Sequence, residues 1–192
     1  MIMDATSRED LPEGIAANRV PTWMLPHTPA HVLKKYRPDM LLLDGLLSVD
    51  APARLDLPIP PRRLQHIQET CTLHIVEFTY TIESCYADTI AYKREQHVAL
   101  VQALSQAGWT IHSPQPSESV HILVMGSTGT IFSSTPETLQ TLGIPPKDVT
   151  TVLQTLHQYA VQYAASILGL RRKLERSTDV FQPAPPIIDD PP

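Results

Sequence analysis

The stretch that decides the fold is TLHIVEFTYT at residues 72–81, which is rich in β-branched and aromatic residues. Such residues favour a strand, and their alternation places Glu77 on one face and His74 on the other. Over residues 86–107 the apolar spacing changes to that of a helix, and Gly108 ends it. We therefore expect a ten-residue strand followed directly by a helix.

Outward from this unit, the chain shows further regular segments. MLLLD at residues 40–44 is a short apolar run between Pro38 and Gly45, which predicts a buried strand. The remaining expected elements are strands over 109–112, 119–125 and 130–133, a turn over 126–129, and helices over 134–143 and 148–176. This order predicts an α/β (α+β) fold with one central mixed β-sheet flanked by helices, including a long C-terminal helix.

The positions of the prolines indicate the domain organisation. The chain has 192 residues and 19 prolines, about twice the average share. We expect a flexible Pro-rich arm over 1–30, one domain over 31–178, and a disordered Pro-rich tail over 179–192. Within the domain, the proline-rich interval 48–70 predicts a long surface loop between two strands.

Several functional classes are disfavoured. No run of 18 apolar residues exists, and the first ten residues lack the pattern of a secretory signal, so we expect an intracellular protein without a membrane partner. The two cysteines, Cys71 and Cys85, do not make a disulfide framework. The eight histidines lack zinc-ligand spacing, and the 126–129 segment fits neither a phosphate loop nor a nucleophile elbow.

The net charge of −5 argues at first against a nucleic-acid partner. The acidic excess, however, lies in residues 1–19 and 179–192, so that the intervening chain is neutral. Basic residues within it are clumped at positions 34–37, 62–63, 93–94 and 171–176. Such clumps form solvated surface or hold a phosphate backbone, and charge alone does not separate the two.

Two carboxylates occupy positions of special interest. Asp39 precedes the 40–44 strand, and Glu77 lies in the middle of an apolar strand, where an unpaired carboxylate costs several kcal/mol. Glu77 therefore either forms a salt bridge with Lys93 or Arg94, faces water on an edge strand, or binds a cation.

The order of these segments resembles a known superfamily. RPDMLLLDG (37–45), LHIVEFTYT (73–81) and YADTIAYKREQHVALVQALSQAGW (86–109) follow one another, and VHILVMGSTGTIFSSTPETLQTLGI (120–144) comes after them. This run is similar to PD-(D/E)xK nucleases, and more narrowly to the restriction-like endonuclease domain of non-LTR retrotransposon proteins that contain a reverse transcriptase. The likeness covers about residues 31–177.

The resemblance implies a metal-dependent DNA endonuclease that nicks target DNA by phosphodiester hydrolysis. Asp39 and Glu77 would bind Mg²⁺ (or Mn²⁺), which favours carboxylate oxygen and activates water. Thr79 stands where the family pattern has its lysine, so the catalytic cation would come from Lys93 on the following helix.

The resemblance also implies partners. DNA would be contacted through six basic residues: Lys34, Lys35, Arg37, Arg62, Arg63 and Arg94. A reverse transcriptase or DNA-targeting domain would act in cis or trans, and the location would be nuclear. Two alternatives stay open: a catalytically inactive nuclease-like fold serving as a DNA-binding or protein-interaction module, and a small scaffold that oligomerises through its long C-terminal helix.

Overall fold

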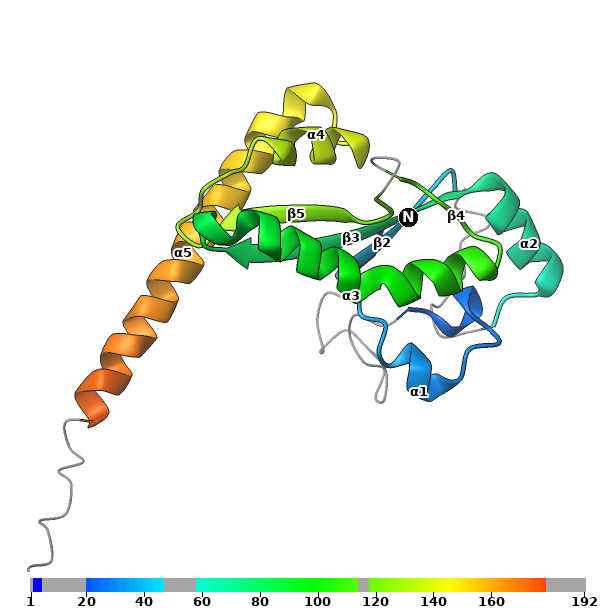
Figure 1. Cartoon of the computed structure of the whole chain (residues 1–192). Helices are drawn as coiled ribbons and strands as arrows, with labels where there is room; N and C mark the ends of the chain where they lie inside the picture. The colour runs from blue at the N-terminus through cyan, green and yellow to red at the C-terminus, as the bar shows by residue number, and fades with distance from the viewer. Residues whose placement is uncertain (1, 5–19, 47–57, 114–117, 179–192) are drawn as a thin grey trace, which may run out of the picture.

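A single mixed sheet organises the molecule. The computed structural model describes residues 2–4, 20–46, 58–113 and 118–178. Within these residues the strands are β1 (Ile2–Asp4), β2 (Met40–Asp44), β3 (Thr72–Thr81), β4 (Thr110–Ile111) and β5 (His121–Gly126). β2 pairs antiparallel with both β1 and β3, whereas β4 and β5 pair parallel with different parts of β3. β3, the strand expected over 72–81, is therefore the centre of the sheet (Figure 1).

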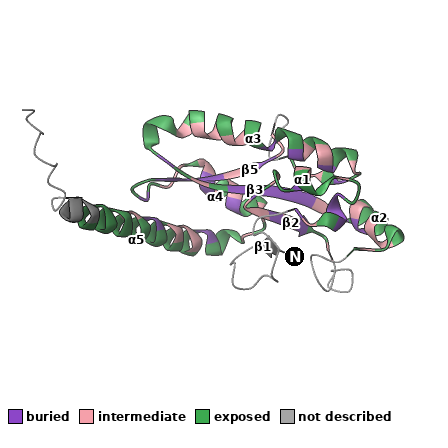
Figure 2. Ribbon diagram, turned by 90° about the horizontal axis from the view of Figure 1, so that it is seen from below, coloured by how far each residue is buried: buried purple, intermediate pink, exposed green. Residues whose placement is uncertain are grey.

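Helices cover both faces of this sheet. The α-helices are α1 (Ala30–Leu33), α2 (Pro61–Thr70), α3 (Tyr86–Gln106), α4 (Ser134–Thr141) and α5 (Pro146–Thr178), with short 3₁₀ turns η1 (Thr22–Met24) and η2 (Glu83–Cys85). α3 lies on one side of the sheet, while α4 and the start of α5 lie on the other (Figure 2). The rest of α5 extends past the sheet edge. The expected fold class, a mixed sheet flanked by helices with a long C-terminal helix, is confirmed.

Two apolar cores follow from the alternation of β3. Leu73 and Ile75 face α3 and pack with Leu100 and Leu104 of that helix in the larger core. Val76 faces the other way and packs with Leu123, Leu139 and Val149 of β5, α4 and α5. The two faces of β3 therefore contact two different cores.

The expectation of a flexible arm over 1–30 is wrong for its last third. Val20, Trp23, Met24 and Leu25 are buried in the larger core, and Trp109 Nε1 donates a hydrogen bond of 2.9 Å to Met24 O. The prolines restrict this segment to short turns, but they do not prevent apolar side chains from packing. Residues 5–19 and the tail at 179–192 lie outside the described residues.

The expectation of a loop over 48–70 is also wrong in its second half, which forms α2. Pro61 occupies the first turn of this helix, where a proline costs no hydrogen bond. Ile67 is fully buried against the sheet, so proline here starts a helix instead of marking a loop. Residues 47–57 lie outside the described residues.

Two smaller expectations fail as well. The strand expected over 130–133 is reduced to one bridge between Met125 and Ile131. On α3, Val98 is exposed, whereas Leu100 and Leu104 are buried. Among the described residues, no helix is both long and apolar enough to cross a membrane.

Candidate active site

Asp39 and Glu77 meet on the α3 face of the sheet. The β2–β3 ladder pairs Met40 with Val76, so that one step further along the same register Asp39 lies opposite Glu77. Asp39 Oδ2 accepts a hydrogen bond of 2.8 Å from Phe78 N, which holds the carboxylate beside β3. The two carboxylates predicted from the sequence therefore lie beside each other, Glu77 on β3 and Asp39 in the bend one residue before β2.

Glu77 is buried, with only 4 % of its surface exposed, and α3 supplies its partners. Lys93 Nζ forms an ion pair with Glu77 Oε1, and His97 Nε2 lies 3.0 Å from Glu77 Oε2. Lys93 and His97 are four residues apart on a helix, so they project from the same side of α3 toward the sheet. Of the alternatives open at the sequence level, the salt bridge to Lys93 is present.

The electrostatics of the two carboxylates differ. Burial alone would raise the pKa of Glu77, but the hydrogen bonds from His97 and Lys93 outweigh it and hold that pKa below its ordinary value. Burial raises the pKa of Asp39, the hydrogen bond from Phe78 opposes this, and the charge of Glu77 adds to the rise. Lys93 and His97 also act on Asp39, which shows that all four groups share one site.

Thr79 and Lys93 are placed differently with respect to Glu77. Thr79 is half-buried on β3, two residues beyond Glu77, and carries no cation, whereas Lys93 contacts the carboxylate from the helix. His97 is the member of this site that the sequence did not assign. Its signal is the spacing of four from Lys93 on a helix that faces an acidic strand residue.

The six predicted DNA-contacting residues have different surroundings. Lys34 and Lys35, which follow α1, are exposed, as is Arg62 on α2. Arg37 is exposed and its Nε donates to Lys34 O at 3.1 Å, and Arg63 is half-buried. Arg94 forms an ion pair with Glu118, so its guanidinium is already engaged. α1 and α2 lie at the end of the molecule opposite the C-terminal part of α5 (Figure 1).

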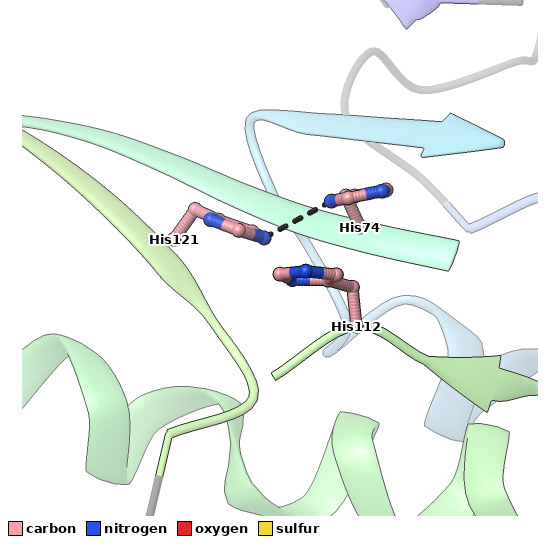
Figure 3. Close-up of side chains that lie close together, drawn as sticks. All are labelled: His74, His112 and His121. Carbon is pink, nitrogen blue, oxygen red and sulfur yellow. Dashed lines mark hydrogen bonds between the residues drawn. The ribbon is translucent and has the colours of Figure 1, made fainter. Parts of the chain in front are cut away.

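A second cluster of polar side chains lies on the other face of β3. His74 of β3, His112 just after β4 and His121 at the start of β5 bring one ligand nitrogen each to within 4.8 Å of one another (Figure 3). In the described part of the chain, this is the one group of three or more histidine, cysteine or acidic side chains that converges in this way. No zinc-ligand spacing is visible in the sequence because the cluster depends on strand pairing, with His74 and His121 separated by 47 residues.

Two histidines of this cluster have lowered pKa values. Burial lowers the pKa of His121 to about 4, and the neighbouring His74 and His112 add to this effect. Burial likewise lowers the pKa of His74, with His112 adding to the shift and Asp44 opposing it. Neutral imidazoles are the form in which histidine binds metals.

Comparison of the chain with protein-family models, with curated proteins and with solved structures gave no match. The arrangement of the residues themselves is therefore the basis for a functional assignment.

Proposed function

We propose that this protein is a metal-dependent DNA endonuclease that hydrolyses phosphodiester bonds at the site formed by Asp39, Glu77 and Lys93. The observation that carries the proposal is that Asp39, one residue before β2, lies beside Glu77 of β3, with a lysine from α3 paired to Glu77. Two carboxylates and one cation in a single site suit the hydrolysis of a phosphate diester.

The donor set fits a divalent cation of the Mg²⁺ type. The raised pKa of Asp39 reflects burial first, and the nearby charge of Glu77 adds to it. Asp39 makes its hydrogen bond through Oδ2, which leaves Oδ1 without a hydrogen-bond partner in the described part of the chain. Asp39 and Glu77 would hold the ion, and a bound Mg²⁺ or Mn²⁺ would supply charge neutralisation and water activation.

The protein's own groups have separate tasks in this proposal. Lys93 sits beside the carboxylates with a side chain that is one-fifth exposed, so its ammonium can face an incoming phosphate. His97 is buried and holds Glu77 in place from the opposite oxygen, which makes it a positioning residue. The hydrogen bond from Phe78 N orients Asp39 in the same way.

The test is a nicking assay on supercoiled plasmid DNA with Mg²⁺ or Mn²⁺. Asp39→Asn and Glu77→Gln remove one charge each with little change in shape, and both should abolish metal-dependent nicking. Lys93→Ala should slow nicking by about two to three powers of ten, the effect of losing one group that stabilises transition-state charge. Thr79→Ala should change the rate far less.

Glu95→Gln is the matched control because Glu95 is an exposed carboxylate on the same helix. This variant should nick DNA at the wild-type rate. Absence of metal-dependent nicking by the wild-type protein on supercoiled, linear and single-stranded DNA would overturn the proposal. Survival of nicking in Glu77→Gln would show that the cutting site lies elsewhere.

One observation favours a second candidate, an inactive nuclease-like fold that binds DNA or protein. Both oxygens of Glu77 already have partners on α3, as in a buried structural ion pair. In that case Glu77→Gln would lower the stability of the protein, and the wild-type protein would bind DNA without cutting it.

A further inference from the structure

We propose that His74, His112 and His121 form a zinc-binding site that ties β3 to the end of β4 and the start of β5. The site is separate from the proposed nuclease site. Glu77 faces α3, whereas His74 lies on the opposite side of the same strand. The experiment that tests the zinc site is therefore independent of the test of the proposed function.

Strand pairing brings the three histidines together. His112 N donates a hydrogen bond of 2.8 Å to Leu73 O, which extends the parallel β3–β4 ladder and places His112 beside His74. His121 pairs with Val76 at the first position of the β3–β5 ladder. The cluster therefore lies between β4 and β5 along one edge of β3.

The three rings lie close together. His74 and His112 stack with their centroids 4.6 Å apart, and His121 lies 5.1 and 5.2 Å from the two. His74 Nδ1 and His121 Nε2 are 3.1 Å apart, and one nitrogen of each ring lies within 4.8 Å of the others. Ligand nitrogens around tetrahedral zinc, at about 2.0–2.1 Å from the ion, lie roughly 3.4 Å from one another. Because the rings are stacked, zinc binding would turn them so that their in-plane lone pairs point at one ion.

The polar atoms of the cluster are incompletely satisfied. His121 is only 1 % exposed and His74 only 4 %. The Nδ1 atoms of His112 and His121 are both buried and lack a hydrogen-bond partner. Buried polar nitrogens normally have partners, and these two orphan nitrogens belong to two of the three clustered imidazoles, although His121 faces His74 through its other nitrogen, Nε2. A borderline-soft divalent cation is the ligand that three clustered imidazoles suit.

An access route is also present. His74 lies on the wall of a cavity of about 300 Å³ between β2 and the end of α4, and Asp44 and Gly143 line the same cavity. The ion can enter by this cavity, and water from it can fill the fourth coordination position.

The experiment uses the full chain, freed of metal with EDTA and then titrated with Zn²⁺ against a chromophoric chelator. We expect one tightly bound zinc per chain and a rise in the thermal unfolding midpoint on zinc addition. His112→Ala is the first variant because His112 is the least buried of the three residues. It should weaken zinc binding by at least about 100-fold, since loss of even an outer partner of a ligand costs roughly 10- to 100-fold.

Controls separate this site from other zinc ligands. His66→Ala, at an exposed position on α2, and Cys85→Ser, at the exposed cysteine, should both bind zinc as the wild type does. Since His74→Ala and His121→Ala could fail to fold, Co²⁺ binding to the wild-type chain provides a second measurement, with the visible spectrum expected for a tetrahedral nitrogen site. The proposal is overturned if the wild type binds no stoichiometric zinc, or if His112→Ala binds it with unchanged affinity.

Discussion

At the scale of single residues, two glycines show how local conformation decides the effect of one methyl group. Gly129 has a φ of +89°, and a Cβ there would lie 2.9 Å from both His157 Nδ1 and Val161 Cγ2. Gly169 lies in the exposed part of α5, and a Cβ there would meet nothing within 4 Å. The same substitution should therefore have opposite effects at the two positions.

We expect Gly129→Ala to destabilise the protein by at least about 1 kcal/mol, because alanine tolerates this conformation poorly and the neighbours must move. Gly169→Ala should stabilise it by about 0.5–1 kcal/mol through helix propensity. Denaturant unfolding of both variants beside the wild type measures the difference. Equal effects of the two substitutions would contradict the assigned turn conformation.

Glu83 gives a prediction that depends on pH. Its Oε1 accepts hydrogen bonds from Thr130 Oγ1 at 2.7 Å and from Thr128 Oγ1 at 3.2 Å, which join η2 to the turn after β5. The hydrogen bond from Thr130, with that from Thr128, lowers the pKa of Glu83 below 4.5. A lowered pKa in the folded state gives stability that is present above pH 4.5 and lost as the pH falls through the lowered value.

Glu83→Ala should therefore be less stable than the wild type at pH 7, and the difference should shrink as the pH falls below about 4.5. Thermal unfolding of both proteins between pH 3 and pH 7 measures this. Glu95→Ala removes an exposed acidic residue in the middle of α3 and serves as the control. A difference between wild type and Glu83→Ala that does not change with pH would contradict the assigned contacts.

At the scale of elements, the sequence predicts correctly those elements that have a local sequence signal. β3 and α3 were predicted to within about a residue, because a β-branched run and a helical spacing are local signals. α2 was missed because its prolines were taken for loop residues, although Pro61 starts the helix. The segment over 130–133 has strand-like composition, but it finds only one bridging partner.

The same distinction applies to the sites. Asp39 and Glu77 could be chosen from sequence because each stands out locally, as a carboxylate at a strand start or in an apolar strand, whereas Lys93 was chosen through the resemblance to PD-(D/E)xK nucleases. The histidine cluster could not be chosen, because it exists only through the register of β4 and β5 against β3. Whether the Asp39 site cuts DNA stays a prediction.

The exposed segment of α5 after Ala165 gives a prediction at this scale. The helix has 33 residues, and every described side chain from Ala165 to Lys173 is exposed. A chain ending after Ser166 should therefore keep the fold and unfold at a temperature close to that of the full chain. Thermal unfolding and gel filtration of the two chains make the comparison. A clear loss of stability would show that this part of α5 is covered in the intact protein.

At the scale of the whole molecule, charge distribution decides how DNA would approach. The net charge of −5 opposes binding at long range, so local basic residues must provide the attraction. Lys34, Lys35 and Arg62 are exposed at the end of the molecule formed by α1 and α2 (Figure 1). Arg94 is bound to Glu118 and contributes less to such a surface than its sequence position implies.

If DNA binds there, its affinity should depend strongly on salt, because each neutralised phosphate releases counterions. Replacing both Lys34 and Lys35 with alanine should weaken binding at every DNA sequence and reduce the slope of log affinity against log salt by about 1–2. Lys147→Ala, an exposed lysine at the start of α5, should leave affinity and slope unchanged. Fluorescence anisotropy with a labelled duplex between 50 and 200 mM salt measures both quantities. A slope that is the same in the double variant and the wild type would place the DNA-binding surface on another part of the molecule, and the nuclease proposal would then need a different path for DNA to reach Asp39 and Glu77.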